Sequence, residues 1–383
     1  MEERTRAYLR GRFGDHYRRA EITPPPEAHE REWGYVPWTE APGETYVRHN
    51  SLLDLGDLSA FLSRERPRHV YFSAGRYETP SASTMSEKSW RGSDLIFDLD
   101  ADHLPGTSPE DSYREMLAAC KGALQRLLDF LEDDFGFDDL TVVFSGSRGY
   151  HVHVRDETVQ SLERDARREI VDYVRGIGLD PDSLVRTEMR GSVTARVLPT
   201  DGGWGRRVHE RLLTFVDEIE DQEKAAAMER LQKLEGIGES RAETIYGAVE
   251  QNREAIERGN VEAGGVGLRT LVDSLVSDVV ADQNAPIDEP VTTDRLIRLP
   301  GSLHGGSGLA VRRIPRDELE GFDPLVDAVP ETFRRHDIAI EVTDGGVVEL
   351  GGDRFTLEER EVTVPEYLGA FLMCRGRAEK GQE

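Results

Sequence analysis

Lysine is scarce in this chain of 383 residues, because five of its 48 basic residues are lysine and 43 are arginine. Cysteine is scarcer still: Cys120 and Cys374 lie far apart and form no CxxC pair, which excludes a disulfide framework and a cysteine-rich zinc site. No apolar run approaches the length of a membrane span. The amino-terminal residues are charged and contain no signal-peptide core. We therefore expect a soluble, cytoplasmic protein.

Acidic residues dominate the charge, since 74 Asp and Glu against 48 Lys and Arg give a net charge of −26. An acidic chain with arginine in place of lysine is typical of a high-salt cytoplasm, where carboxylates hold hydration and net charge keeps the chain soluble. The alternative explanation, disorder, is disfavoured by the 37% hydrophobic content. Net acidity ordinarily speaks against nucleic-acid binding, but in a salt-adapted protein the local arginine clusters matter more.

The pattern along the chain predicts an α/β (α+β) fold. Strands are expected over residues 46–53, 69–73, 93–99, 140–144 and 150–154. Helices are expected over residues 2–20, 109–134 and 157–177. The domain organisation that we expect is a core in two parts, 1–204 and 282–374, an inserted, mostly helical lobe over 205–281, and a flexible tail over 375–383.

The first motif, GSDLIFDLDADH at residues 92–103, places two carboxylates, Asp98 and Asp100, at the end of a predicted buried strand. Residues i and i+2 of a strand point to the same face, so the two carboxylates lie side by side. Burying them unpaired is costly. A divalent cation removes that cost, since Mg²⁺ prefers one or two carboxylates together with substrate phosphates. The alternative is a solvated, Asp-rich turn that caps the strand.

The second motif, FSGSRGYHVHV at residues 144–154, joins two strands by a turn whose glycines permit tight backbone geometry. Such a turn can offer backbone N–H groups to a phosphate. Ser145, Arg148 and His151 add a hydroxyl, a guanidinium suited to phosphate and an imidazole donor. The alternative is an ordinary hairpin with polar turn residues. His151 and His153 share a strand face, but no third soft ligand lies nearby in sequence to complete a metal site.

The third motif covers residues 286–309, with Asp288 near its start and RLIRLPGSLHGGSGL at residues 295–309. It supplies a third carboxylate, Asp288, and two basic groups, Arg298 and His304. Three carboxylates with Arg and His are the groups that two-metal phosphoryl or nucleotidyl transfer requires. The metals neutralise a triphosphate and activate the attacking hydroxyl, while basic side chains hold the leaving pyrophosphate.

Together, in this order, the three motifs resemble the catalytic small subunit of the archaeal-eukaryotic DNA primase, and the composition resembles the haloarchaeal branch. The resemblance covers nearly the whole chain. It implies a mixed α/β primase core with a mixed sheet. It also implies the synthesis of RNA or DNA primers from nucleoside triphosphates on a single-stranded DNA template during replication. It also implies a heterodimer with a large primase subunit, which carries an iron–sulfur cluster in the family.

By this resemblance, Asp98, Asp100 and Asp288 are the catalytic carboxylates and hold two Mg²⁺ or Mn²⁺ ions. The positions that match nucleotide contacts of the family are Ser145, Arg148, His151, Arg298 and His304. Arg48 and Lys88 match less specific basic positions near the site.

The sequence departs from the family at two places. Many relatives carry a Cys/His zinc knuckle between the Asp-x-Asp strand and the Gly-rich turn, but here that interval holds only His103 and Cys120, so we expect no structural zinc. The segment between Asp288 and Arg298 is also shorter than usual, near Asp294 and Arg295. We expect this shortening to alter how Asp288 and Arg298 converge at the site.

Residues 234–245, LEGIGESRAETI, resemble a helix-hairpin-helix, whose turn presents N–H groups to nucleic-acid phosphate. The alternative is a plain helical turn with glycine as its C-cap, since Glu235, Glu239 and Glu243 would repel a phosphate.

Two other functions stay open for the whole chain. A primase-like polymerase for DNA repair or gap filling is disfavoured because no fused ligase or nuclease segment is present. A non-catalytic assembly subunit is disfavoured because none of the three carboxylates is missing.

Overall fold

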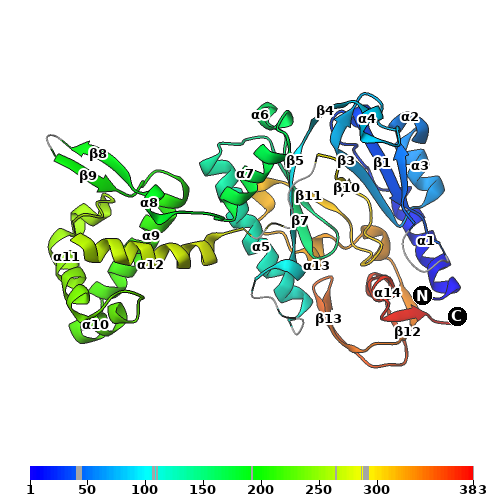
Figure 1. Ribbon diagram of the computed structural model, residues 1–383. Helices are drawn as coiled ribbons and strands as arrows, with labels where there is room; N and C mark the ends of the chain where they lie inside the picture. Colours follow the sequence, from blue (N-terminus) through cyan, green and yellow to red (C-terminus); the bar gives the residue numbers. More distant parts are fainter. Residues whose placement is uncertain are drawn as a thin grey trace. The chain divides into compact units, whose positions relative to one another are not determined.

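The computed structural model describes residues 1–39, 45–105, 108, 111–190, 193–263, 265–285, 287 and 293–382 (Figure 1). The chain divides into two compact units. The first unit consists of Met1–Gly122, Asp138–Arg168 and Ile287–Glu383. The second unit consists of Ala123–Phe137 and Glu169–Pro286. Helices combine with several sheets, which confirms the α/β (α+β) class. Among the described residues every strand pair is antiparallel, so the sheets themselves are not mixed.

Two antiparallel sheets form the part of the first unit that carries the motifs. One has the strand order β10-β3-β1-β2, with β4 also paired to β3, and the other has the order β11-β6-β7-β5. Strands β5 and β7 are rich in β-branched and aromatic residues and are largely buried, as residue types that favour extended structure should be. The bounds are β1 Arg31–Val36, β2 Val47–Asn50, β3 His69–Tyr77, β4 Trp90–Ser93, β5 Leu95–Asp100, β6 Leu140–Phe144, β7 Gly149–Val154, β10 Leu296–Arg298 and β11 Arg312–Ile314.

Helices and smaller sheets complete the first unit. Its helices are α1 Glu3–Tyr17, α2 Leu52–Leu55, α3 Leu58–Glu65, α4 Met85–Lys88, α6 Glu157–Gln160, α13 Pro324–Asp327 and α14 Glu366–Cys374. Short 3₁₀ helices cover Ala28–Glu30, Ala101–His103, Arg316–Glu318 and Glu331–Phe333. The remaining strands are β12 Asp337–Val342, β13 Gly346–Leu350, β14 Asp353–Leu357, β15 Glu361–Pro365 and β16 Ala378–Lys380. Helices α5 Tyr113–Asp129 and α7 Arg164–Val174 contribute residues to both units.

The flexible tail expected over residues 375–383 is wrong for residues 378–380, which form β16. This strand pairs with β12, and the backbone N–H of Lys380 also donates to Thr5 Oγ1 at 2.8 Å. Ala378 is buried. Backbone pairing to partners far away in the sequence therefore orders a segment that has no apolar pattern of its own.

The second unit is mostly helical and extends beyond the range 205–281 expected for a helical lobe. It adds a hairpin of β8 Arg186–Arg190 and β9 Val193–Val197. Its helical segments are a π-helical turn Phe130–Asp134, α8 Pro181–Leu184, α9 Gly203–Glu220, α10 Lys224–Gln232, α11 Glu239–Glu257 and α12 Gly265–Gln283. Segment 234–245 contains the turn from α10 into α11, with Gly236 at φ +77°. None of the described helices is both long and apolar enough to cross a membrane.

Candidate active site

Asp98 and Asp100 lie on β5, directly opposite His151 and Gly149 of β7. Their spacing puts both carboxylates on one face of the strand. Both side chains are half-buried, whereas Phe97, which points to the other face, is fully buried. The strand therefore anchors in the core and presents two carboxylates at its carboxyl end, as the sequence predicts.

Asp98 is held between two basic side chains. Its Oδ2 accepts a hydrogen bond from Nη2 of Arg295, and its Oδ1 lies 3.4 Å from Nε2 of His151. The Oδ1 of Asp100 accepts a hydrogen bond from the backbone N–H of Asp102 at 3.1 Å. A carboxylate that is only 17% exposed needs such partners to offset its desolvation.

The carboxylate oxygens of Asp98 and Asp100 suit a hard divalent cation such as Mg²⁺ or Mn²⁺ better than zinc, which favours nitrogen and sulfur ligands. Asp288, the third carboxylate of the sequence analysis, lies outside the described residues. Among the residues that the structure describes, no group of three or more His, Cys, Asp and Glu side chains gathers as a candidate metal site. Asp98 and Asp100 thus place two suitable carboxylates on one strand face, and the cation site itself, with its third ligand, stays a prediction.

The Gly-rich turn between β6 and β7 is closed by Ser145. The backbone N–H of Ser145 donates to the carbonyl of Gly149 at 2.9 Å, and the N–H of Gly149 lies 3.3 Å from Ser145 Oγ. Gly146 has φ +83°, and a Cβ built on it would lie 2.8 Å from the Cβ of His304. The second and third motifs, more than 150 residues apart, therefore meet at this turn.

Arg148 makes a bidentate ion pair with Asp102. Its Nη1 lies 2.7 Å from Oδ1 and its Nη2 lies 2.6 Å from Oδ2 of Asp102. Both side chains are more than one-third exposed. Two parallel bonds of this kind match the geometry by which arginine binds phosphate, so Asp102 engages the pair of donors that a phosphate contact of Arg148 would need.

His304 is buried in the turn of the third motif. Its Nδ1 accepts a hydrogen bond from the N–H of Gly306 at 3.1 Å, so the neutral ring carries its proton on Nε2. Burial and then the positive charge of Arg298 lower the pKa of His304 well below 6.5. The ring of His69 meets it edge-on at 4.8 Å between centroids. A neutral His304 can therefore donate one hydrogen bond from Nε2.

His151 is fully buried beside Asp98. Burial lowers its pKa to about 4, although the negative charge of Asp98 opposes the shift. Arg298 contributes to lowering the pKa of both His151 and His304, so its charge lies near both rings. Arg298 itself lies on β10 with its guanidinium 5.6 Å from the ring centroid of Tyr71. The two histidines are neutral at pH 7, and Arg298 is a cation that acts on both rings.

Arg48 and Lys88, the less specific basic positions, converge on Glu32. The Nε of Arg48 lies 3.1 Å from Oε1 of Glu32, and Lys88 Nζ donates to Oε2. Burial raises the pKa of Glu32, but the hydrogen bonds from Lys88 and Arg48 outweigh it and the pKa lies below its usual value. Lys88 is buried in this cluster, and Arg48 is 42% exposed. A contact of either with substrate stays a prediction.

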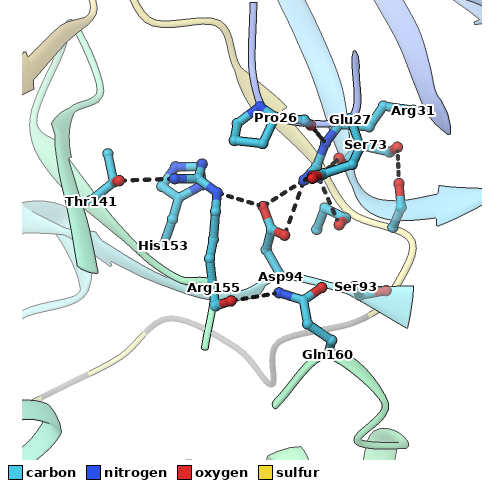
Figure 2. Close-up of polar contacts among 12 residues, drawn as sticks. Pro26, Glu27, Arg31, Ser73, Ser93, Asp94, Thr141, His153, Arg155 and Gln160 are labelled. Carbon is cyan, nitrogen blue, oxygen red and sulfur yellow. Dashed lines mark hydrogen bonds and ion pairs between the residues drawn. The ribbon is translucent and has the colours of Figure 1, made fainter. Parts of the chain in front are cut away.

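A second buried cluster holds the start of β5. Figure 2 shows Arg31 and Arg155 converging on Asp94, the residue before the strand. Arg31 Nη2 donates to both Asp94 oxygens at 3.0 and 2.9 Å, and Arg155 Nε donates to Oδ2 at 3.2 Å. Arg155 also bonds Thr141 Oγ1 and contacts His153 Nδ1. Because Arg31 belongs to β1 and Arg155 follows β7, Asp94 ties the two sheets together where the carboxylate strand begins.

Sequence reasoning missed the partners that complete the site. Arg295 was noted only as part of a shortened segment, and Asp102 only as part of the first motif. Both pair across long sequence separations, Arg295 with Asp98 and Asp102 with Arg148. The one available signal was chemical: a half-buried carboxylate on a strand requires a cationic partner.

A family model described as the DNA primase small subunit matches residues 97–315, which include both β5 carboxylates, the Gly-rich turn and the third motif. The chain belongs to the DNA primase small subunit family. It is 65% identical to the DNA primase small subunit PriS of Haloarcula marismortui and 60% identical to that of Halorubrum lacusprofundi. Identity to the PriS of Methanococcoides burtonii is 40%. Each of these matches covers 100% of both chains.

Proposed function

We propose that this chain is the catalytic subunit of a DNA primase, a nucleotidyltransferase that makes short RNA or DNA primers on single-stranded DNA during replication. It acts in the cytoplasm together with a large primase subunit. The observation that carries the proposal is the convergence of three distant motifs. Asp98 lies beside His151, and Gly146 of the turn lies against His304. Membership of the DNA primase small subunit family supports the same function.

Asp98 and Asp100, with Asp288, would hold Mg²⁺ or Mn²⁺, which when bound would neutralise the triphosphate and activate the attacking hydroxyl. Negative charge develops on the leaving pyrophosphate, and hydrogen-bond donors that are already in position stabilise it. His304 Nε2–H offers one such donor, since its Nδ1 is fixed by Gly306. Arg148 supplies a bidentate donor once it exchanges Asp102 for a phosphate.

The test is primer synthesis on a single-stranded template in molar KCl, with labelled ribo- and deoxynucleotides supplied separately. We expect Asp98→Ala and Asp100→Ala each to lose at least about 100-fold in incorporation. The matched control is Asp278→Ala, an exposed aspartate of α12, which should retain full activity. Near-wild-type synthesis by either β5 variant would falsify the assignment of these carboxylates.

The same assay separates the competing functions. Incorporation of deoxynucleotides alone, and only at gaps in duplex DNA, would identify a repair polymerase. A wild-type chain that incorporates nothing, even with its large subunit present, would identify a non-catalytic assembly subunit.

A further inference from the structure

A cavity of about 460 Å³ lies in the first unit, and arginine dominates its wall. Its volume falls in the range of small-molecule sites. Two aromatic residues, Tyr113 and Phe371, form part of the same wall. The charged lining residues are Arg114, Arg354, Arg375, Arg377, Glu115 and Glu349. Within the lining itself, the cationic groups outnumber the carboxylates.

Tyr113 joins this cavity to the Gly-rich turn. Its hydroxyl donates to the backbone carbonyl of Ser147 at 2.6 Å, and Ser147 directly precedes Arg148. Burial raises the pKa of Tyr113 to about 12, so the phenol stays a donor at neutral pH. The wall of the cavity is therefore fixed to the turn from which Arg148 projects.

Arg375, just after α14, stacks on both aromatic rings of the cavity. Its guanidinium carbon lies 4.7 Å from the ring centroid of Tyr113 and 5.3 Å from that of Phe371. Cation–π contacts of this kind orient a guanidinium without using its N–H donors. The planar donors are then free to bind phosphate oxygens in pairs.

The other cavity arginines already have carboxylate partners. Arg377 Nε lies 3.2 Å from Asp344 Oδ2, and Arg114 Nη1 lies 3.1 Å from Asp323 Oδ2. Arg354 reaches Glu349 at 3.7 Å. Within the described part of the chain, Arg375 makes no ion pair.

Arg375 is exposed to solvent, but partial desolvation by its neighbours lowers its pKa. The charges of Arg148 and Arg377 lower it further, against the opposing effect of Tyr113 and Asp102. Arg375 is thus a positive charge among positive charges. Its position would be stabilised by a bound anion.

We propose that this cavity binds pyrophosphate, with Arg375 taking the terminal phosphates of a triphosphate held by Arg148 and then retaining the pyrophosphate product. This inference rests on the proposed function. In the transfer, the attacking hydroxyl oxygen bonds to the α-phosphorus and its proton passes to water. The bond from that phosphorus to the bridging oxygen breaks, and pyrophosphate leaves with the electron pair. Because Arg375 lies over the rings of Tyr113 and Phe371, it competes with bases for stacking there, which favours inorganic polyphosphate over a nucleic-acid strand.

The direct test is equilibrium dialysis of radiolabelled pyrophosphate against the full chain, without template or nucleotide, at one fixed KCl concentration. We expect Arg375→Ala and Arg375→Gln to weaken pyrophosphate binding roughly tenfold to a hundredfold, as loss of a charge-assisted contact does. Arg375→Lys should fall between, since it keeps the charge but loses the planar pair of donors. The matched control is Arg360→Ala, an exposed arginine of the same unit outside the cavity.

A kinetic measurement then distinguishes binding from packing. In primer synthesis, Arg375→Gln should raise KM for the triphosphate and relieve inhibition by added pyrophosphate, each by about the factor by which pyrophosphate binding weakens. Unchanged pyrophosphate affinity in all three Arg375 variants, or an equal loss in Arg360→Ala, overturns the inference. So does binding of a single-stranded oligonucleotide in the cavity without any binding of pyrophosphate.

The two proposals fail separately. A wild-type chain that makes primers while its Arg375 variants bind pyrophosphate normally would leave the proposed function standing and remove this cavity from it. A wild-type chain that makes no primers but binds pyrophosphate through Arg375 would remove the proposed function and leave this cavity as a pyrophosphate site.

Discussion

At the scale of single residues, the proposed triphosphate site contains two different kinds of hydrogen-bond donor for phosphate. Arg148 is charged and part-exposed, and His304 is buried and neutral. We expect Arg148→Ala to weaken triphosphate binding roughly tenfold to a hundredfold, because a hydrogen bond to a charged group contributes about 1.5–3 kcal/mol. His304→Ala should cost less, since its donor is neutral. Titration of binding with a fluorescent triphosphate measures both, and an unchanged affinity would remove that residue from the site.

The buried His153 makes the free energy of unfolding depend on pH, and a substitution at this position isolates that dependence. Burial, and then the charge of Arg155, lowers its pKa well below 6.5. The unfolded chain therefore takes up a proton near pH 6.5 that the folded chain does not, so the stability that depends on neutral His153 is present above pH 6.5 and is lost as pH falls. We expect His153→Gln to reduce the slope of unfolding free energy against pH below 6.5 by up to about 1.4 kcal/mol per pH unit.

Chemical denaturation at a series of pH values between 4 and 7 measures that slope. His29→Gln, at an exposed histidine of the same unit, is the matched control and should leave the slope as it is. Parallel curves for wild type and His153→Gln would contradict the prediction.

How much of the site follows from sequence depends on the range of the contact. The shared face of Asp98 and Asp100 follows from the two-residue period of a strand, and the structure places both carboxylates at the end of β5. The contact between Arg295 and Asp98 spans 197 residues. No local pattern encodes such a contact, because it depends on how β10 and β5 are brought together by the fold.

At the scale of elements, β5 and β7 approach so closely that Gly149 has no room for a side chain. A Cβ on Gly149 would lie 2.0 Å from the carbonyl oxygen of Leu99. Gly149→Ala must therefore push apart the strands that carry Asp98 and His151. We expect a loss of at least about 2 kcal/mol in unfolding free energy, measured by chemical denaturation.

Gly247→Ala is the matched control, because Gly247 lies inside α11 with nothing within 4 Å of its added Cβ. That substitution should stabilise the chain by about 0.5–1 kcal/mol. A Gly149→Ala variant as stable as wild type would show that the two strands can separate at little cost.

Elements were predictable where their apolar pattern is strong. The strand expected over residues 140–144 is β6, with the same bounds. The strand expected over 46–53 is shorter, because Ser51 caps the helix α2 and ends the extended segment at Asn50. Strand β16 was missed, since its ordering comes from pairing with β12 and not from its own composition.

At the scale of the whole molecule, the net charge of −26 predicts that the folded state needs salt. Self-repulsion destabilises a compact acidic chain, and the Debye length falls to about 3 Å at molar salt. We expect the melting temperature to rise steadily from low to molar KCl. A melting temperature that stays flat or falls over that range would contradict salt adaptation.

The ion pair between Arg148 and Asp102 bears on how substrate binding in the proposed site depends on salt concentration. An uncovered arginine sheds bulk anions when it meets a phosphate, and each such release makes binding weaker as salt rises. In the proposed site, Arg148 would instead trade one attached carboxylate for one phosphate, and the freed carboxylate would take up a cation from a KCl-rich solution. Substrate capture would then be an ion-exchange reaction, in which concentrated salt supplies a reactant instead of a competitor.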